Sequence, residues 1–143
     1  MPLPPASAVL LDTNVLVAAI KHPTRQTATY RLVVRLLGRP DLRLVGDEVL
    51  AEEYLRYAEV FPSSTGKALL SALLNRMEIV HIEDRFLAAC APYFAAEETA
   101  DRLHAAACLQ LGAVLVSNDR HFEPARKAGL ISVCSVTDAV RTW

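Results

Sequence analysis

The chain has 143 residues, of which 52% are hydrophobic and 22% are charged, and its formal net charge is −1. This length is typical of one domain with a sizeable core, and the apolar content excludes a disordered chain. The charge excludes a generically basic nucleic-acid binder, which would be far more positive. Any contact with nucleic acid is therefore expected to depend on a local patch or a bound cation.

Strand and helix patterns alternate along the chain, and most helices follow a residue that can cap them. In chain order, the expected elements are a strand over 9–11, a helix over 15–20, a helix over 30–37, a strand over 42–45, a helix over 49–61, a helix over 69–77, a strand over 79–82, a helix over 86–94, a helix over 100–111, a strand over 114–116, a strand over 131–133 and a short C-terminal helix. The expected caps are Thr13 or Asn14, Asp47, Ser63 or Ser64, and Ser135 or Thr137. Gly38 and Gly112 should end two helices, and Pro92 should disturb another.

This alternation predicts an α/β protein in which a parallel sheet is covered by helices on both faces. No repeat, low-complexity segment or linker divides the sequence, so residues 1–143 are expected to form one domain. In open parallel sheets, ligands bind beyond the carboxyl ends of the strands. Acidic residues that directly follow strands are therefore the most informative.

Cysteine usage and the apolar runs bear on location. Cys90, Cys108 and Cys134 are widely spaced and form no C-x-x-C pair, so neither a zinc knuckle nor a disulfide framework is indicated. We expect reduced core thiols in a cytoplasmic protein. The N-terminal stretch lacks a positive region and reaches a charge at Asp12, which argues against a signal peptide. The longest uncharged run, 103–118, is too short and too polar to cross a membrane.

Two aspartates follow predicted strands. Asp12 comes directly after V-L-L, and Asp119 follows the strand over 114–116 after Ser117 and Asn118. Each alone could simply cap the next helix. Together they are expected at the same edge of the sheet, where they favour a shared site.

Two helices supply further acids. In DEVLAEEYLRY, a helical wheel places Glu53 on the apolar side and Glu52 on the polar side. A carboxylate within an apolar face is costly unless it has a partner, so Glu53 is the better site candidate, although the assignment stays open by one residue. In ADRLHAAAC, Asp101 and His104 share one helix face. The alternatives are that Asp101 only favours the helix dipole and that His104 is a hydrogen-bonded structural histidine.

The four carboxylates Asp12, Glu53, Asp101 and Asp119 can converge on one pocket. Like charges about 4 Å apart repel by roughly 4 kcal/mol at an effective dielectric constant of 20, so they cannot all stay ionised without a cation. A site made of hard oxygen ligands suits Mg²⁺ or Mn²⁺. Such ions polarise phosphoryl oxygens and activate water for phosphodiester hydrolysis.

These residues resemble the PIN domain family, which includes the VapC-like toxin ribonucleases of toxin–antitoxin pairs. The resemblance rests on DTNVL, LAEEYLRY, ADRLHAAAC and VLVSNDRHF, which occur in the expected order. It implies a three-layer α/β/α sandwich with a central, mainly parallel five-stranded sheet. It also implies a ribonuclease dependent on Mg²⁺ or Mn²⁺, an RNA substrate, an antitoxin protein as partner and a homodimer.

The resemblance assigns catalysis and metal binding to Asp12, Glu53, Asp101 and Asp119. It places four polar residues around them: Asn14, Ser117, Asn118 and His104. One position departs from the family, which commonly has Ser where this chain has Asp47; since Asp caps a helix equally well, we expect no consequence. RNA contacts are expected from the basic residues near the acids, namely Arg120, His121, Lys21 and Arg25.

Other functions remain to be weighed. The main alternative is a non-catalytic PIN-fold module that binds RNA or protein, and the complete acidic set argues against it. A haloacid-dehalogenase-like phosphatase would need D-x-D where this chain has Asn14, and no P-loop motif occurs. The homodimer has independent support in the sequence, because Tyr54, Tyr57 and Phe61 lie close together on one helix and aromatic residues are enriched at interface cores. The alternative is that these side chains fill the core of the monomer.

Overall fold

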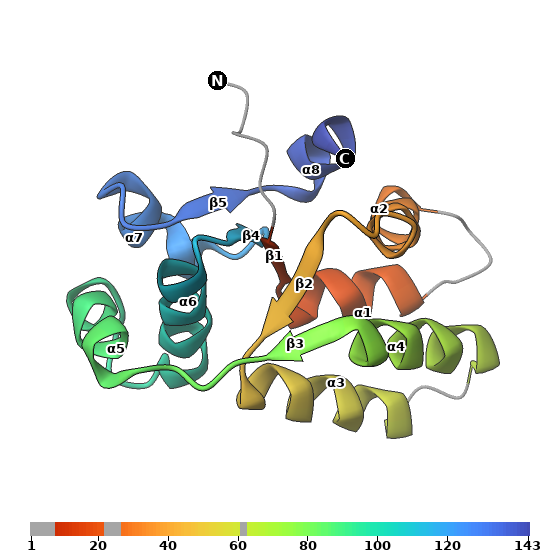
Figure 1. The fold of residues 1–143 in the computed structure, drawn as a ribbon, viewed down its shortest axis with the longest axis horizontal. Helices are drawn as coiled ribbons and strands as arrows, with labels where there is room; N and C mark the ends of the chain where they lie inside the picture. Colours follow the sequence, from red (N-terminus) through yellow and green to blue (C-terminus); the bar gives the residue numbers. More distant parts are fainter. Residues whose placement is uncertain (1–7, 22–26, 61–62) are drawn as a thin grey trace.

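The computed structural model describes residues 8–21, 27–60 and 63–143 (Figure 1). Within these ranges all five strands are parallel and form one sheet in the order β3-β2-β1-β4-β5. The strands are β1 (Ala8–Leu11), β2 (Arg43–Gly46), β3 (Met77–Ile79), β4 (Val114–Val116) and β5 (Ser132–Cys134). The predicted α/β class and the five-stranded parallel sheet are confirmed.

Helices cover both faces of the sheet, which gives the three-layer α/β/α arrangement. The helices are α1 (Thr13–Lys21), α2 (Ala28–Leu37), α3 (Glu48–Val60), α4 (Ser64–Arg76), α5 (Asp84–Cys90), α6 (Thr99–Leu111), α7 (Glu123–Lys127) and α8 (Val136–Thr142). Figure 1 shows α1, α2 and α4 on one side of the sheet and α5 and α6 on the other. Because β1 is the central strand and β4 is its neighbour, the carboxyl ends of both lie between the two helical layers.

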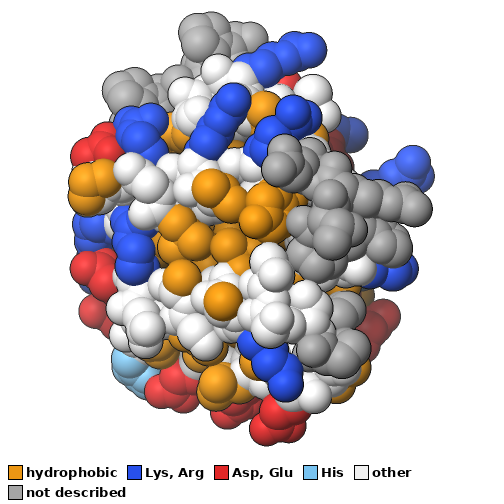
Figure 2. Space-filling view, turned by 90° about the vertical axis from the view of Figure 1, so that its right-hand side faces the viewer, with side chains coloured by type: hydrophobic (Ala, Val, Ile, Leu, Met, Phe, Trp, Pro, Cys, Tyr) orange, Lys and Arg blue, Asp and Glu red, His pale blue; other side chains and the backbone are white. Residues whose placement is uncertain are grey.

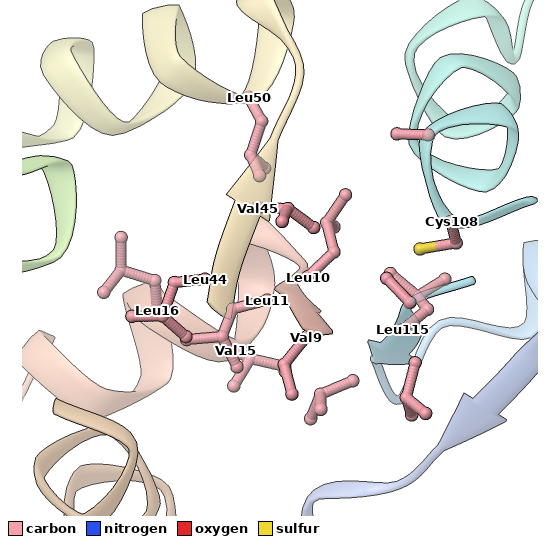
Figure 3. Close-up of a cluster of buried hydrophobic side chains, with 14 of the residues drawn as sticks. Val9, Leu10, Leu11, Val15, Leu16, Leu44, Val45, Leu50, Cys108 and Leu115 are labelled. Atoms are coloured by element: carbon pink, nitrogen blue, oxygen red, sulfur yellow. The ribbon is translucent and has the colours of Figure 1, made fainter. Parts of the chain in front are cut away.

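The core explains why β1 is apolar without interruption. Its four residues are all at most 3% exposed, as expected for a parallel strand that is covered on both faces. In Figure 3, Leu11 lies with Leu16 of α1 and Leu44 of β2, whereas Leu10 lies on the side of Cys108 and Leu115. Asp12 is the first polar residue after this run, so the fold carries its carboxylate to the end of a buried strand.

Several helix ends follow the predicted signals. Ser63 caps α4 by accepting a hydrogen bond from the Gly66 amide, and Ser135 caps α8 by accepting one from Asp138. Gly112 ends α6 in the left-handed conformation, with φ of 63°. The helix predicted over 86–94 ends at Cys90 and continues as a 3-10 turn over Ala91–Tyr93 that contains Pro92.

Several boundaries differ from the prediction. Neither Thr13 nor Asn14 caps α1, because the helix already begins at Thr13 and the Asp12 carbonyl accepts its first hydrogen bonds. The third strand runs over Met77–Ile79 instead of 79–82. Its early start has a physical cause: the Arg76 guanidinium donates hydrogen bonds to four carbonyls between Leu36 and Leu42, which fixes the end of α4 directly before the strand. The last strand is shifted by one residue, to Ser132–Cys134.

The three cysteines are buried and free, as predicted. Across the described parts of the chain, no helix combines the length and apolar character needed to cross a membrane. One argument made for a dimer needs correction, because Tyr54 is only 2% exposed and its hydroxyl donates a hydrogen bond to the Leu11 carbonyl at 2.7 Å. Tyr54 therefore belongs to the core of the single chain, and Phe61 lies outside the described residues.

Candidate active site

Asp12 is buried at the carboxyl end of β1. Its side chain is held by Ser117, whose hydroxyl donates a hydrogen bond to Oδ2 at 2.7 Å, and the residue is 5% exposed. Burial raises the pKa of the Asp12 carboxyl, the bond from Ser117 opposes that rise, and the nearby charges of Asp101 and Asp119 raise the pKa further. The Asp12 carboxyl is thus close enough to Asp101 and Asp119 to be affected by their charges.

Asp119 follows β4 and shares Ser117 with Asp12. Its backbone N–H donates to Ser117 Oγ at 3.0 Å, while its carboxylate accepts a hydrogen bond from the His121 amide. One buried hydroxyl therefore links the ends of β1 and β4. Asn118 has a different task, because its side-chain oxygen accepts a hydrogen bond from the Val136 amide at the start of α8.

Glu53 reaches the site from α3. The hydrogen bond from Tyr54 to the Leu11 carbonyl fixes α3 against the end of β1, and the Thr13 hydroxyl donates a hydrogen bond to Glu53 Oε2. Glu53 is half-buried, whereas Glu52 is exposed. The geometry thus favours Glu53 as the glutamate at this site, and Thr13 is a contact that sequence reasoning did not identify.

Asp101 lies on the first turn of α6, within a cluster that also includes His121 and Glu98. The distance from His121 Nδ1 is 2.8 Å to Asp101 Oδ2, 3.0 Å to Glu98 Oε2 and 3.5 Å to Asp119 Oδ1. The hydrogen bond with Asp101, together with the charges of Asp119 and Glu98, raises the pKa of His121. Sequence reasoning missed Glu98, which lies one helical turn before Asp101; its other oxygen accepts a hydrogen bond from the Ala95 amide at 2.7 Å.

His104 is paired with Asp47. Its Nδ1 lies 2.5 Å from Asp47 Oδ2, and both side chains are only 1% exposed. Burial alone would lower the pKa of His104, but the hydrogen bond and charge of Asp47, with smaller contributions from Glu53 and Asp12, raise it above its ordinary value. Asp47 also caps α3, because Oδ1 accepts a hydrogen bond from the Leu50 amide at 2.8 Å. Asp47 thus caps the helix as predicted, and its second oxygen also binds His104, which a serine side chain could not do.

A cavity of about 270 Å³ opens at this place. It is lined by Asp12, Thr13, Asn14, Glu53, Arg56, Tyr57, Asp101 and His104. Asp119 instead lines two adjoining cavities, one of them shared with Asn14 and the other with Arg120. The structure therefore brings three of the four expected carboxylates into one cavity and places the fourth beside them, joined to Asp12 through Ser117 and to Asp101 through His121.

Three of the four residues expected to contact RNA lie within the described parts of the chain. Lys21 is exposed at the end of α1, and Arg120 and His121 are exposed beside Asp119. Arg25 lies outside the described residues. Arg56, an exposed residue of α3 that was not among the expected RNA contacts, also lines the cavity. Its spacing of three residues from Glu53 is the sequence signal that indicates this position.

Comparison with known proteins agrees with this arrangement. A family model described as PIN domain matches residues 9–128. Similar solved structures include VapBC2 from Rickettsia felis bound to a DNA fragment from its promoter, with 18% sequence identity, a TM-score of 0.63 and coverage of 90% of this chain and 98% of that chain. VapBC-1 from nontypeable Haemophilus influenzae has 16% identity, a TM-score of 0.64 and coverage of 91% and 98%.

FitAcB from Neisseria gonorrhoeae is also similar, with 17% identity, a TM-score of 0.60 and coverage of 90% of this chain and 98% of that chain. At such identities the likeness to solved structures shows the fold. A search of curated protein sequences found no match.

Proposed function

The chain belongs to the PIN domain family, and from this premise we propose that it is a metal-dependent ribonuclease that hydrolyses phosphodiester bonds of RNA. The observation that carries the proposal is the meeting of Asp12, Glu53 and Asp101 in one cavity, with Asp119 joined to Asp12 through a shared hydroxyl. Asp12 and Asp119 follow β1 and β4, and Glu53 and Asp101 lie on α3 and α6, so four parts of the chain contribute to this edge of the sheet. The site belongs to the single domain that we propose for residues 1–143.

The donor set fits a divalent cation. Asp12, Glu53, Asp101 and Asp119 offer carboxylate oxygens, which are the ligands that Mg²⁺ and Mn²⁺ prefer. Burial and the nearby charges of Asp101 and Asp119 raise the pKa of Asp12, and a bound cation would favour its ionised form. The chemistry that a bound ion supplies here is Lewis-acid activation of a phosphoryl oxygen and of the attacking water.

The surrounding residues hold the carboxylates in place. Ser117 engages one oxygen of Asp12, and Thr13 engages one oxygen of Glu53, so each side chain is oriented and keeps a second oxygen for a ligand. Asn14 lies on the wall between two cavities. We assign to Asn14, Ser117, Asn118 and His104 the support of the acids, and to Lys21, Arg25, Arg120 and His121 contacts with the RNA backbone.

The test is cleavage of a panel of structured RNAs by the purified protein, with Mg²⁺, with Mn²⁺ and with EDTA. We expect cleavage only with an added ion, and none with the Asp12→Asn variant. Cleavage that is equal in EDTA would contradict the metal dependence. RNA binding without cleavage under every condition would instead support the alternative, a PIN-fold binding module.

We further propose that the chain is the toxin of a toxin–antitoxin pair. The supporting observations are the fold shared with VapBC2, VapBC-1 and FitAcB and the face shown in Figure 2, where hydrophobic side chains gather among Lys and Arg side chains. Such a face suits an antitoxin segment with apolar and acidic residues. Expression in a bacterial host should stop growth for the wild-type chain and leave growth unchanged for Asp12→Asn; growth unaffected by both would contradict the toxin role.

We also propose that the protein acts in the cytoplasm as a homodimer. Three buried free thiols suit a reducing compartment, and the exposed apolar residues Val34, Leu55 and Val60, which are 45%, 54% and 68% exposed, could meet a second copy. Light scattering at micromolar concentration decides the oligomeric state. A mass near 15.7 kDa would rule out the dimer.

A further inference from the structure

The buried pair of His104 and Asp47 is not explained by ion binding. Both side chains are 1% exposed and 2.5 Å apart, yet His104 also lines the cavity that contains Asp12, Glu53 and Asp101. Since Nδ1 is bonded to Asp47, Nε2 is the ring nitrogen left to face the cavity. A ring nitrogen that becomes a hydrogen-bond donor when the imidazole is protonated thus faces an acidic cavity.

Asp47 keeps this ring in one orientation and favours its protonated form. It is itself fixed as the cap of α3 through its bond with the Leu50 amide. Its charge holds the pKa of His104 above the ordinary value in spite of burial, which favours the imidazolium form with a proton on both nitrogens. His104 thus places a ring that can carry a positive charge in the same cavity as the carboxylates of Asp12, Glu53 and Asp101.

A second cation stands at the rim of the same cavity. Arg56 lies three residues after Glu53 on α3, is exposed, and lines the cavity together with His104. Within the described parts of the chain, Arg56 takes part in no ion pair. Its guanidinium is thus available to an anion, and guanidinium groups suit phosphate in both charge and shape.

We propose that His104 and Arg56 together bind a phosphate group of the RNA strand, with Nε2–H of His104 at the floor and the guanidinium of Arg56 at the rim. The inference rests on the proposed function, because it takes RNA as the ligand. It answers a physical difficulty of that function: a polyanion must enter a cavity lined by three carboxylates, and attraction from fixed cations offsets part of their repulsion. His104 and Arg56 are then substrate-binding residues.

The competing explanation is that the pair of Asp47 and His104 only ties α3 to α6. Two variants of His104 separate the explanations, because Asn places its amide where Nδ1 lies and Gln places its amide near Nε2. His104→Asn keeps a donor for Asp47 and removes the group that faces the cavity. His104→Gln does the reverse. A structural tie predicts that His104→Asn is the milder change, whereas phosphate binding predicts that it is the more severe one.

The experiment measures fluorescence anisotropy of a labelled 20-nucleotide single-stranded RNA of mixed sequence, without divalent ions, over a series of salt concentrations. All proteins carry Asp12→Asn, which prevents cleavage and removes one repulsive charge. Arg56→Ala and His104→Asn are compared with Arg43→Ala, which removes the same charge at the amino end of β2, at the opposite edge of the sheet. Thermal melts confirm that each variant is folded.

We expect Arg56→Ala and His104→Asn each to weaken RNA binding about tenfold or more, as the loss of a charge-assisted hydrogen bond does. Each should also reduce the slope of log K against log salt by about 0.7, the value for one phosphate contact with a single strand. His104→Gln should retain part of the affinity although it melts at a lower temperature. Arg43→Ala should match the parent.

Binding by Arg56→Ala and His104→Asn equal to that of Arg43→Ala would overturn the proposal, as would no measurable binding by the parent. Milder loss in His104→Asn than in His104→Gln, without a change of slope, would assign the pair to a structural tie and equally overturn it. Because the assay needs no cleavage, its outcome is separate from the proposed function. Loss of binding in the variants of a protein that never cleaves RNA would support this inference and contradict the nuclease.

Discussion

The buried and the exposed halves of the acidic site are built in different ways. In the buried half, Asp12, Asp47 and His104 are at most 5% exposed. Each makes a hydrogen bond with another buried residue, and these bonds are present without a bound ligand. In the exposed half, the Asp101 and Asp119 side chains are 21% and 24% exposed, and both contact the ring of His121, which is 54% exposed.

This difference indicates which part of the site is pre-organised. Moving Asp12 would require breaking its bond with Ser117 inside the core, where an unpaired polar group costs about 1–3 kcal/mol. Moving Asp101 away from His121 costs little, because solvent replaces the contact. We therefore expect the buried half to keep its geometry when an ion or RNA binds, and the exposed half to adjust.

The largest effect is expected from Asp12→Asn in the buried half. Activity should fall by more than the roughly 10–100-fold that the loss of an outer-shell partner costs. Stability of the metal-free protein should hold or rise. The pKa of Asp12 is raised from 3.8, so the stability linked to this carboxyl is present below that value and is lost as the pH rises through the folded pKa. At neutral pH, the uncharged Asn side chain avoids the cost of burying an ionised carboxylate, so the free energy of unfolding should not fall.

Initial cleavage rates and a thermal melt in EDTA check both parts of this prediction. The Asn side chain retains an oxygen that can accept the hydrogen bond from Ser117, so the local structure should be kept. A variant that still cleaves RNA, or one that melts several degrees lower, would show that Asp12 is a structural residue.

Glu53→Gln and Glu52→Gln form a matched pair one residue apart on α3. Glu53 lines the cavity and accepts a hydrogen bond from Thr13, whereas Glu52 is exposed. We expect at least a roughly tenfold loss of activity for Glu53→Gln and wild-type rates for Glu52→Gln. Cleavage kinetics at equal ion concentration measure the difference, and the reverse order would reassign the glutamate.

Sequence patterns predicted the buried elements well because periodicity and position reflect burial. The strands β1 and β4 and the places of Asp12 and Asp119 after them follow from unbroken apolar runs such as V-L-L and V-L-V. The bond between His104 and Asp47 could not be predicted in this way, since it joins residues that are 57 positions apart. Glu98 was missed for the same reason: its contact with His121 depends on how α6 meets the end of β4.

Ser117→Ala tests whether the shared hydroxyl organises both strand ends. The variant removes the donor to Asp12 and the acceptor of the Asp119 amide. We expect activity to fall about 10–100-fold, with partial recovery at higher Mn²⁺ concentration. Ser63→Ala is the control, because it removes the cap of α4 at a cost of about 1 kcal/mol and should leave activity unchanged. Equal activity in the two variants would argue against a role for Ser117 in the site.

The pH dependence of stability reports on the buried pair. The pKa of His104 is raised above 6.5, so its contribution to stability is fully present below that pH and is lost as the pH rises through the folded pKa. Metal-free protein should therefore melt at progressively lower temperature above neutral pH, and His104→Asn should flatten this trend. His121→Ala should keep most of it, because His121 is exposed. A trend that persists unchanged in His104→Asn would contradict the assignment.

The smallest effect is expected from Arg120→Ala at the exposed half. Arg120 directly follows Asp119 and lines the large adjoining cavity, so it can reach a phosphate of an RNA strand that enters the site. A contact made through solvent-exposed charge contributes little free energy, and RNA affinity should fall only a few-fold. The informative quantity is the salt slope, which should drop by about 0.7. Arg39→Ala is the comparison, because Arg39 is occupied by an ion pair with Asp41. If the two variants bind RNA with the same affinity and slope, RNA does not cross the exposed half near Arg120, and its path follows Arg56 and His104 instead.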